Sequence, residues 1–62
     1  MTERELEVLG LLDSGLTTRG VADLLSISYE TVRTHLANCY AKLDVHGRVQ
    51  AIKCARDRGL IA

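Results

Sequence analysis

The stretch from residue 28 to 43, SYETVRTHLANCYAKL, limits what this chain can fold into more than any other part of it. Its apolar residues recur at spacings of four, three and four, which marks one face of an α-helix. These residues are Val32, Leu36, Cys39 and Leu43. Ser28 comes just before the first turn, where its hydroxyl can accept a hydrogen bond from a free backbone N–H. We therefore predict a helix over residues 29–43.

The opposite face of this predicted helix carries mostly polar side chains. They are Tyr29, Glu30, Arg33, Thr34 and Ala37. A helix with such a face can lie in the DNA major groove, but the same periodicity is also typical of a plain core helix. Arg33 is the only basic residue in the first half of the helix, so it is the best candidate for a bidentate contact to guanine.

The chain has 62 residues, which is enough for one small core, because a chain of this size buries only about 60% of its unfolded surface. It contains no Pro, Phe or Trp, and Leu, Val, Ile and Ala dominate, which favours helices. We expect an all-α domain that is not an enzyme, since no nucleophile–base pair, phosphate loop or metal motif is found. No catalytic residue is assigned, and no cofactor or small-molecule ligand is expected.

No stretch of the sequence has the roughly 20 apolar residues of a membrane span, and no secretory leader opens it. We expect a soluble, cytoplasmic protein with no membrane partner. Cys39 and Cys54 are interpreted as buried thiols in a reducing compartment. A zinc site that adds His35 and His46 has the spacing H-x3-C-x6-H-x7-C, which matches no zinc signature, so no metal is predicted.

The formal net charge is zero, but the charges are unevenly distributed along the chain. Residues 1–30 hold two basic and six acidic residues, whereas residues 31–62 hold six basic and two acidic residues. The two segments therefore differ in net charge, at −4 and +4. The part from Arg33 onward is the one that can meet phosphate.

A first helix is predicted over residues 3–14. Thr2, followed three residues later by Glu5, is a capping box, in which each side chain satisfies a backbone N–H at the start of a helix. Glu5 is therefore interpreted as a cap and not as a catalytic carboxylate. The other charged residues of this helix, Asp13 among them, are expected to be solvated, and Gly15 supplies the left-handed residue that ends it.

A second helix is predicted over residues 18–25, with a threonine at 17 or 18 as its cap. Three apolar residues are expected to face inward: Val21, Leu24 and Leu25. Residues 26–28 then form the short connection that a helix-turn-helix uses. A fourth helix is predicted over residues 48–58, with Gly47 as its cap and Gly59 as the residue that ends it. Its outward residues are expected to be solvated or to meet a second copy of the chain: Val49, Lys53 and Arg56.

On these residues the chain resembles the LuxR/NarL (GerE-type) C-terminal helix-turn-helix DNA-binding domain. The resemblance rests on TERELEVLGLL, GLTTRGVADLLSISYETVRTHLANCYAKL and VHGRVQA, and it covers almost the whole chain. It implies one four-helix domain over residues 1–62, as the C-terminal part of a larger bacterial transcription regulator. It also implies binding to double-stranded DNA as a homodimer, with RNA polymerase as a further partner.

The resemblance assigns roles to individual residues. Base contacts fall on Arg33, Thr34 and Ala37, with Tyr29 and Glu30 at the start of the reading helix. Phosphate contacts fall on Thr18, Arg19 and Lys42. The fourth helix is the family's dimer contact, which places Val49, Lys53 and Arg56 at the dimer interface.

This sequence also departs from the family pattern. The family commonly has Gly where Ser26 stands, an acid where Gly20 stands, and basic residues at the positions of Asp23, Leu24 and Ala41. The missing basic residues predict weak phosphate affinity, so DNA binding is expected to depend on dimerisation through the fourth helix.

Two other functions are compatible with the same residues. The first is the promoter-reading helix-turn-helix of a sigma factor, which shares the ERE and TVR signatures but does not usually have the fourth helix predicted here. The second is a helical protein-interaction module with no nucleic-acid partner, which the zero net charge favours.

Overall fold

The computed structural model describes residues 1–61, which form four α-helices and no strand. The helices are α1 (Glu3–Asp13), α2 (Thr18–Leu25), α3 (Tyr29–Leu43) and α4 (Arg48–Asp57). The predicted all-α class and all four predicted helices are confirmed. Helices α1 and α4 each end one residue earlier than predicted, because Ser14 and Arg58 cap them.

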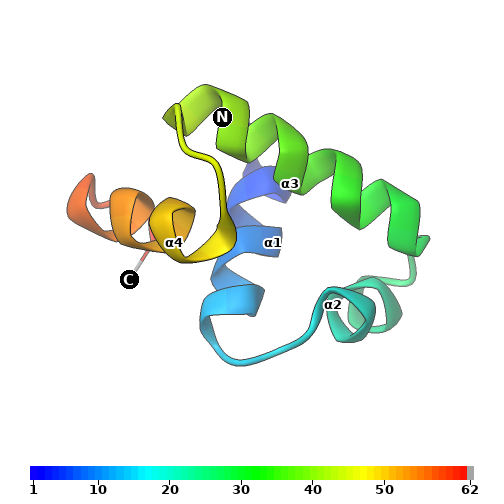
Figure 1. Cartoon of the computed structure of the whole chain (residues 1–62). Coiled ribbons are helices and arrows are strands. Elements are labelled where there is room, and N and C mark those ends of the chain that lie inside the picture. Colours follow the sequence, from blue (N-terminus) through cyan, green and yellow to red (C-terminus); the bar gives the residue numbers. More distant parts are fainter. Residues whose placement is uncertain (62) are drawn as a thin grey trace.

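Helix α1 lies in the middle of the molecule, and the longer α3 runs across it (Figure 1). Helices α2 and α4 lie on either side of α1, and each contacts both α1 and α3. Within residues 1–61 they do not pack against each other. The two central helices therefore hold the domain together. None of the described helices is long and apolar enough to cross a membrane.

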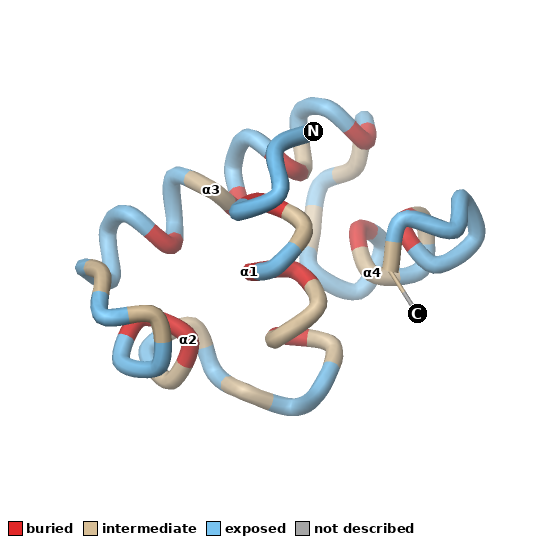
Figure 2. The backbone as a smooth tube through the Cα atoms, turned by 180° about the vertical axis from the view of Figure 1, so that it is seen from behind, coloured by how far each residue is buried: buried red, intermediate tan, exposed pale blue. Residues whose placement is uncertain are grey.

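All four helices contribute to a single core, and their buried residues face inward (Figure 2). Helix α3 supplies the four residues that the sequence predicted: Val32, Leu36, Cys39 and Leu43. On α2, however, the expectation for Leu24 is wrong, since this side chain is 61% exposed. The inward face of α2 is formed instead by Val21, Ala22 and the half-buried Leu25, which turns Leu24 toward solvent.

The first three helices begin at side-chain caps. The predicted capping box is present: the Glu5 N–H donates to Thr2 Oγ1 at 3.2 Å, and the Thr2 N–H donates to Glu5 Oε1 at 3.0 Å. Thr17 Oγ1 accepts from the Gly20 N–H at 3.0 Å, and Ser28 Oγ accepts from the Thr31 N–H at 3.1 Å. Local sequence therefore determines where α1, α2 and α3 start.

The turn between α2 and α3 contains a residue in the left-handed region. Ser26 has φ 57° and ψ 40°, and the next N–H, that of Ile27, donates to the Ala22 carbonyl at 3.0 Å. This geometry ends α2 and sets the direction of α3, which completes the helix-turn-helix. Glycine adopts this region readily, which suits the Gly that the family resembled by the sequence commonly has at this position.

Glu5 connects the start of α1 to the end of α3. Its side chain is buried, and its Oε1 accepts a hydrogen bond from Lys42 Nζ at 2.7 Å. Two hydrogen bonds lower the pKa of Glu5 from 4.5 to about 2: the one from the Lys42 ammonium has the larger effect, and the one from the Thr2 N–H has the smaller. The sequence predicted the cap but not this ion pair, because the partner lies 37 residues away.

We expect Glu5→Gln to reduce the loss of stability in acid. A carboxyl whose pKa is lowered on folding stabilises the protein above pH 4.5, and this contribution is lost as the pH falls toward about 2. Urea unfolding between pH 7 and pH 3 should therefore show a steeper decline for the wild type than for Glu5→Gln. The matched control is Glu7→Gln, at an exposed Arg4–Glu7 pair, which should keep the wild-type decline. Equal declines for wild type and Glu5→Gln would contradict this role of Glu5.

We expect Ser26→Gly to stabilise the domain by about 0.5–1 kcal/mol, because glycine adopts the left-handed region without the clash of a Cβ atom. Ser14→Gly is the control, since Ser14 caps α1 in the right-handed region and its Oγ donates to the Leu11 carbonyl at 2.7 Å. Urea denaturation should show that the first substitution raises the free energy of unfolding and the second lowers it. A loss of stability in both variants would contradict the strain assigned to Ser26.

Candidate nucleic-acid interface

The side of α3 that faces away from the core forms a continuous exposed surface. All five residues that the sequence predicted as base contacts are exposed on it: Tyr29, Glu30, Arg33, Thr34 and Ala37. Four of them, all except Tyr29, line one shallow recess. Thr34 Oγ1 donates to the Glu30 carbonyl at 3.0 Å, which leaves the hydroxyl oxygen able to accept a further hydrogen bond.

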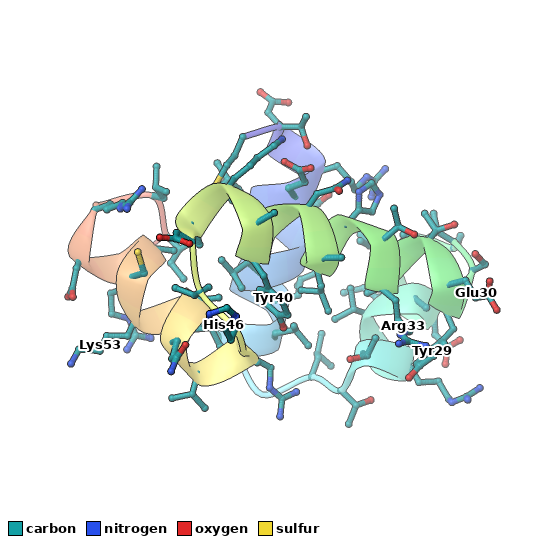
Figure 3. The ribbon with its side chains drawn as sticks, turned by 45° about the horizontal axis from the view of Figure 1, so that its top comes forward. Tyr29, Glu30, Arg33, Tyr40, His46 and Lys53 are labelled. Carbon is teal, nitrogen blue, oxygen red and sulfur yellow. The ribbon has the colours of Figure 1, made fainter. Side chains whose placement is uncertain are left out.

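The start of α3 lies against the start of α2, where two arginines meet one aromatic ring. The guanidinium carbons of Arg19 and Arg33 lie 5.2 and 6.0 Å from the centroid of the Tyr29 ring. Figure 3 shows Tyr29, Glu30 and Arg33 together at this end of α3. A second recess between the two helices is lined by Thr18, Tyr29, Arg33, Leu36, Ala37 and Tyr40. Sequence reasoning did not predict this contact between the helices.

The three predicted phosphate contacts do not lie together. Thr18 and Arg19 belong to the first turn of α2 and lie beside the start of α3. Lys42 belongs to the last turn of α3, where its ammonium is held by Glu5. The structure therefore brings two of the three residues next to the exposed face of α3 and places the third at the far end of that helix.

The predicted dimer residues share one face of α4. Val49, Lys53 and Arg56 line a recess together with Ile52 and Asp57, and Val49 is 79% exposed. Arg56 also forms an ion pair with Asp13 of α1, with 2.5 Å between Nη2 and Oδ1. The expectation that Asp13 is solvated is therefore wrong, because its carboxylate is bound by a cation 43 residues away along the chain.

The cysteines and the remaining tyrosine are packing residues. Cys39 is buried, and its Sγ donates to the Glu5 carbonyl at 3.4 Å. Burial raises the pKa of the Cys39 thiol to about 11 and also raises the pKa of Tyr40. Both cysteines are free thiols, and Cys54 is half-buried. No group of three or more metal-ligating side chains is found within residues 1–61.

Comparison with known proteins identifies relatives over almost the whole chain. The family of bacterial regulatory proteins named luxR (GerE) matches residues 1–55. The response regulatory protein YgeK of Escherichia coli is 42% identical over 60 residues, which is 97% of this chain and 41% of YgeK. The transcriptional regulatory protein LiaR of Bacillus subtilis is 41% identical over 61 residues, which is 98% of this chain and 29% of LiaR. The chain thus spans less than half the length of these relatives.

Solved structures show the same arrangement of helices. The transcription factor GerE superimposes with a TM-score of 0.95 at 39% identity, over 100% of this chain and 92% of GerE. The response regulator ChrA of a heme-sensing two-component system superimposes with a TM-score of 0.93 at 47% identity, over 97% of this chain and 30% of ChrA. The predicted LuxR (GerE-type) family and its four-helix, helix-turn-helix fold are confirmed. The chain belongs to the luxR family of bacterial regulatory proteins.

Proposed function

We propose that this domain binds double-stranded DNA sequence-specifically, with α3 in the major groove, as the output domain of a bacterial transcription regulator. The observation that carries this proposal is the exposed face of α3, where Arg33 lines a recess with Glu30, Thr34 and Ala37. Within residues 1–61, Arg33 forms no ion pair with a carboxylate. Its guanidinium therefore keeps its donors available for a ligand.

The chemistry of this face suits base edges. An arginine can donate two hydrogen bonds to O6 and N7 of guanine, and a glutamate can accept one from N4 of cytosine. The Ala37 methyl group suits the methyl group of thymine. Arg33 would therefore read guanine, with Glu30, Thr34 and Ala37 contacting neighbouring base pairs and Tyr29 at the edge of this contact.

Phosphate contacts are proposed for Thr18 and Arg19, which lie beside the start of α3. Lys42 is the weakest of the three candidates, because its ammonium would have to leave Glu5, 2.7 Å away, to reach a phosphate. A domain with zero net charge and few free cations at this surface gains little non-specific affinity. Two copies bound to two half-sites would compensate for this weak binding.

The second copy is proposed to bind through α4, at the face lined by Val49, Lys53 and Arg56. Lys53 lies at the opposite end of the molecule from Arg33 (Figure 3). This separation supports the proposal, because DNA and a second copy can then be bound at the same time. The Arg56–Asp13 pair anchors one edge of this face to α1.

Three further proposals concern the whole regulator and rest on the family resemblance. The matched relatives are more than twice as long as this chain, which supports a place for it in a larger regulator, and the family resemblance suggests the C-terminal part. Such a regulator acts in the cytoplasm, where the chromosome is. RNA polymerase is proposed as its partner in transcription.

We expect Arg33→Ala to lower affinity for a duplex selected from a random pool by about 1–3 kcal/mol, and to relax the base preference at one position. Binding should be measured by fluorescence anisotropy over a salt series, on the selected and a scrambled duplex. Arg4→Ala removes the same charge from the exposed Arg4–Glu7 pair on α1 and should leave base preference unchanged. Equal binding of both duplexes by wild type and Arg33→Ala would refute Arg33 as a sequence reader.

We expect Val49→Asp to lower affinity for a two-half-site duplex by about tenfold or more, since a buried aspartate would oppose dimer contact. The variant should fold normally, because Val49 is 79% exposed. Its affinity for a single half-site should equal that of the wild type. If the wild-type chain binds one half-site as tightly as two, dimerisation through α4 does not support DNA binding.

A further inference from the structure

Arg19, Tyr29 and Arg33 form a cluster that joins α2 to α3. Arg19 comes from the first turn of α2, and the other two residues come from the first two turns of α3. Both guanidiniums lie within about 6 Å of the ring centroid, the range in which a cation is attracted to an aromatic face. Tyr29 is 41% exposed, so the cluster lies at the surface and not in the core.

The arginines of this cluster form no ion pair within residues 1–61, although Glu30 lines the same recess as Arg33. The cations that do form ion pairs in the described chain are Arg4, Lys42 and Arg56. Neither Arg19 nor Arg33 has such a pair within residues 1–61, although two guanidiniums near one ring repel each other. The ring face is the feature that attracts both of them. Two neighbouring cations that form no ion pair are suited to a ligand that carries negative charge.

We propose that Tyr29 is a positioning residue, whose ring holds Arg19 toward a phosphate and Arg33 toward a base edge of the same DNA site. This inference rests on the proposed function and changes the role of Tyr29, which the family resemblance made a base contact. An arginine side chain loses rotamer freedom when it binds, and an arginine already held against a ring loses less. The Tyr29 side chain thereby orders both the contact of Arg19 with a DNA phosphate and the contact of Arg33 with a base.

This role predicts that affinity and specificity change together. Loss of the ring should weaken a phosphate contact, which lowers the dependence of binding on salt, and should also relax the preference for guanine opposite Arg33. A direct contact of Tyr29 with a base would instead leave the salt dependence unchanged. A purely structural role would lower the unfolding midpoint of the free protein.

The experiment compares wild type, Tyr29→Leu and Tyr29→Phe. In the free protein, NMR should show the side-chain Hδ protons of Arg19 and Arg33 shifted upfield by the ring, relative to those of Arg4. Tyr29→Leu should abolish these shifts and Tyr29→Phe should retain them, with unfolding midpoints near that of the wild type. This measurement needs no DNA, so it tests the cluster independently of the proposed function.

DNA binding by the same proteins tests the consequence. We expect Tyr29→Leu to lower affinity for the selected duplex by about threefold to tenfold. The slope of log affinity against log salt should fall by about 0.9, as in Arg19→Ala. Tyr29→Phe should restore affinity and slope relative to Tyr29→Leu, because the hydroxyl is not needed. Arg4→Ala, which lacks a ring contact, serves as the charge control and should leave the guanine preference unchanged.

A double-mutant cycle completes the test. If Tyr29 acts through the arginines, Tyr29→Leu should have a smaller effect in Arg19→Ala or Arg33→Ala than in the wild type. Additive effects with an unchanged salt slope would overturn the proposal and leave Tyr29 as a direct base contact. The proposal would also be overturned if the Hδ protons of Arg19 and Arg33 showed no upfield NMR shift in the wild type. If the wild type binds neither duplex, the proposed function fails and the positioning role fails with it, while the NMR shifts still report whether the cluster exists.

Discussion

The burial of one face of α3 against its neighbours determines both the stability of this domain and the surface it offers. Val32, Leu36, Cys39 and Leu43 are withdrawn from water on one side. A helix of 15 residues is marginal on its own, so it depends on this packing. Because these side chains must face the core, Arg33, Thr34 and Ala37 must face outward. The same helix therefore supplies part of the core and the exposed surface that we propose binds DNA.

The distribution of charge reconciles zero net charge with the proposed nucleic-acid partner. The acidic first half of the chain neutralises part of the basic second half: Glu5 binds Lys42, and Asp13 binds Arg56. Both ion pairs join α1 to a later helix and lie away from the start of α3. Among the described residues Arg33 forms no such pair, and a tyrosine ring attracts it together with Arg19. Local charge at the surface thus matters more than the total.

The two ion pairs also differ in what they stabilise. Glu5 is buried, is part of a capping box and has a pKa lowered to about 2, so its pair links the start of α1 to the last turn of α3. Asp13 and Arg56 are more exposed and link the end of α1 to α4. The position of α4, and hence of the face proposed for a second copy, depends on this weaker attachment.

The sequence by itself determined the four helices, the caps of three of them at Thr2, Ser28 and Gly47, and the inward residues of α3, because caps and apolar periodicity are local properties of the chain. It left the cap of α2 open between Thr17 and Thr18, and the structure has Thr17. It also predicted the family and which face of α3 is exposed. Only the tertiary structure decided the Glu5–Lys42 and Asp13–Arg56 pairs, the exposure of Leu24 and the meeting of Arg19, Tyr29 and Arg33. Each of these depends on how one helix is rotated and placed against another. That orientation is set by packing between residues far apart in the sequence, which no local pattern records.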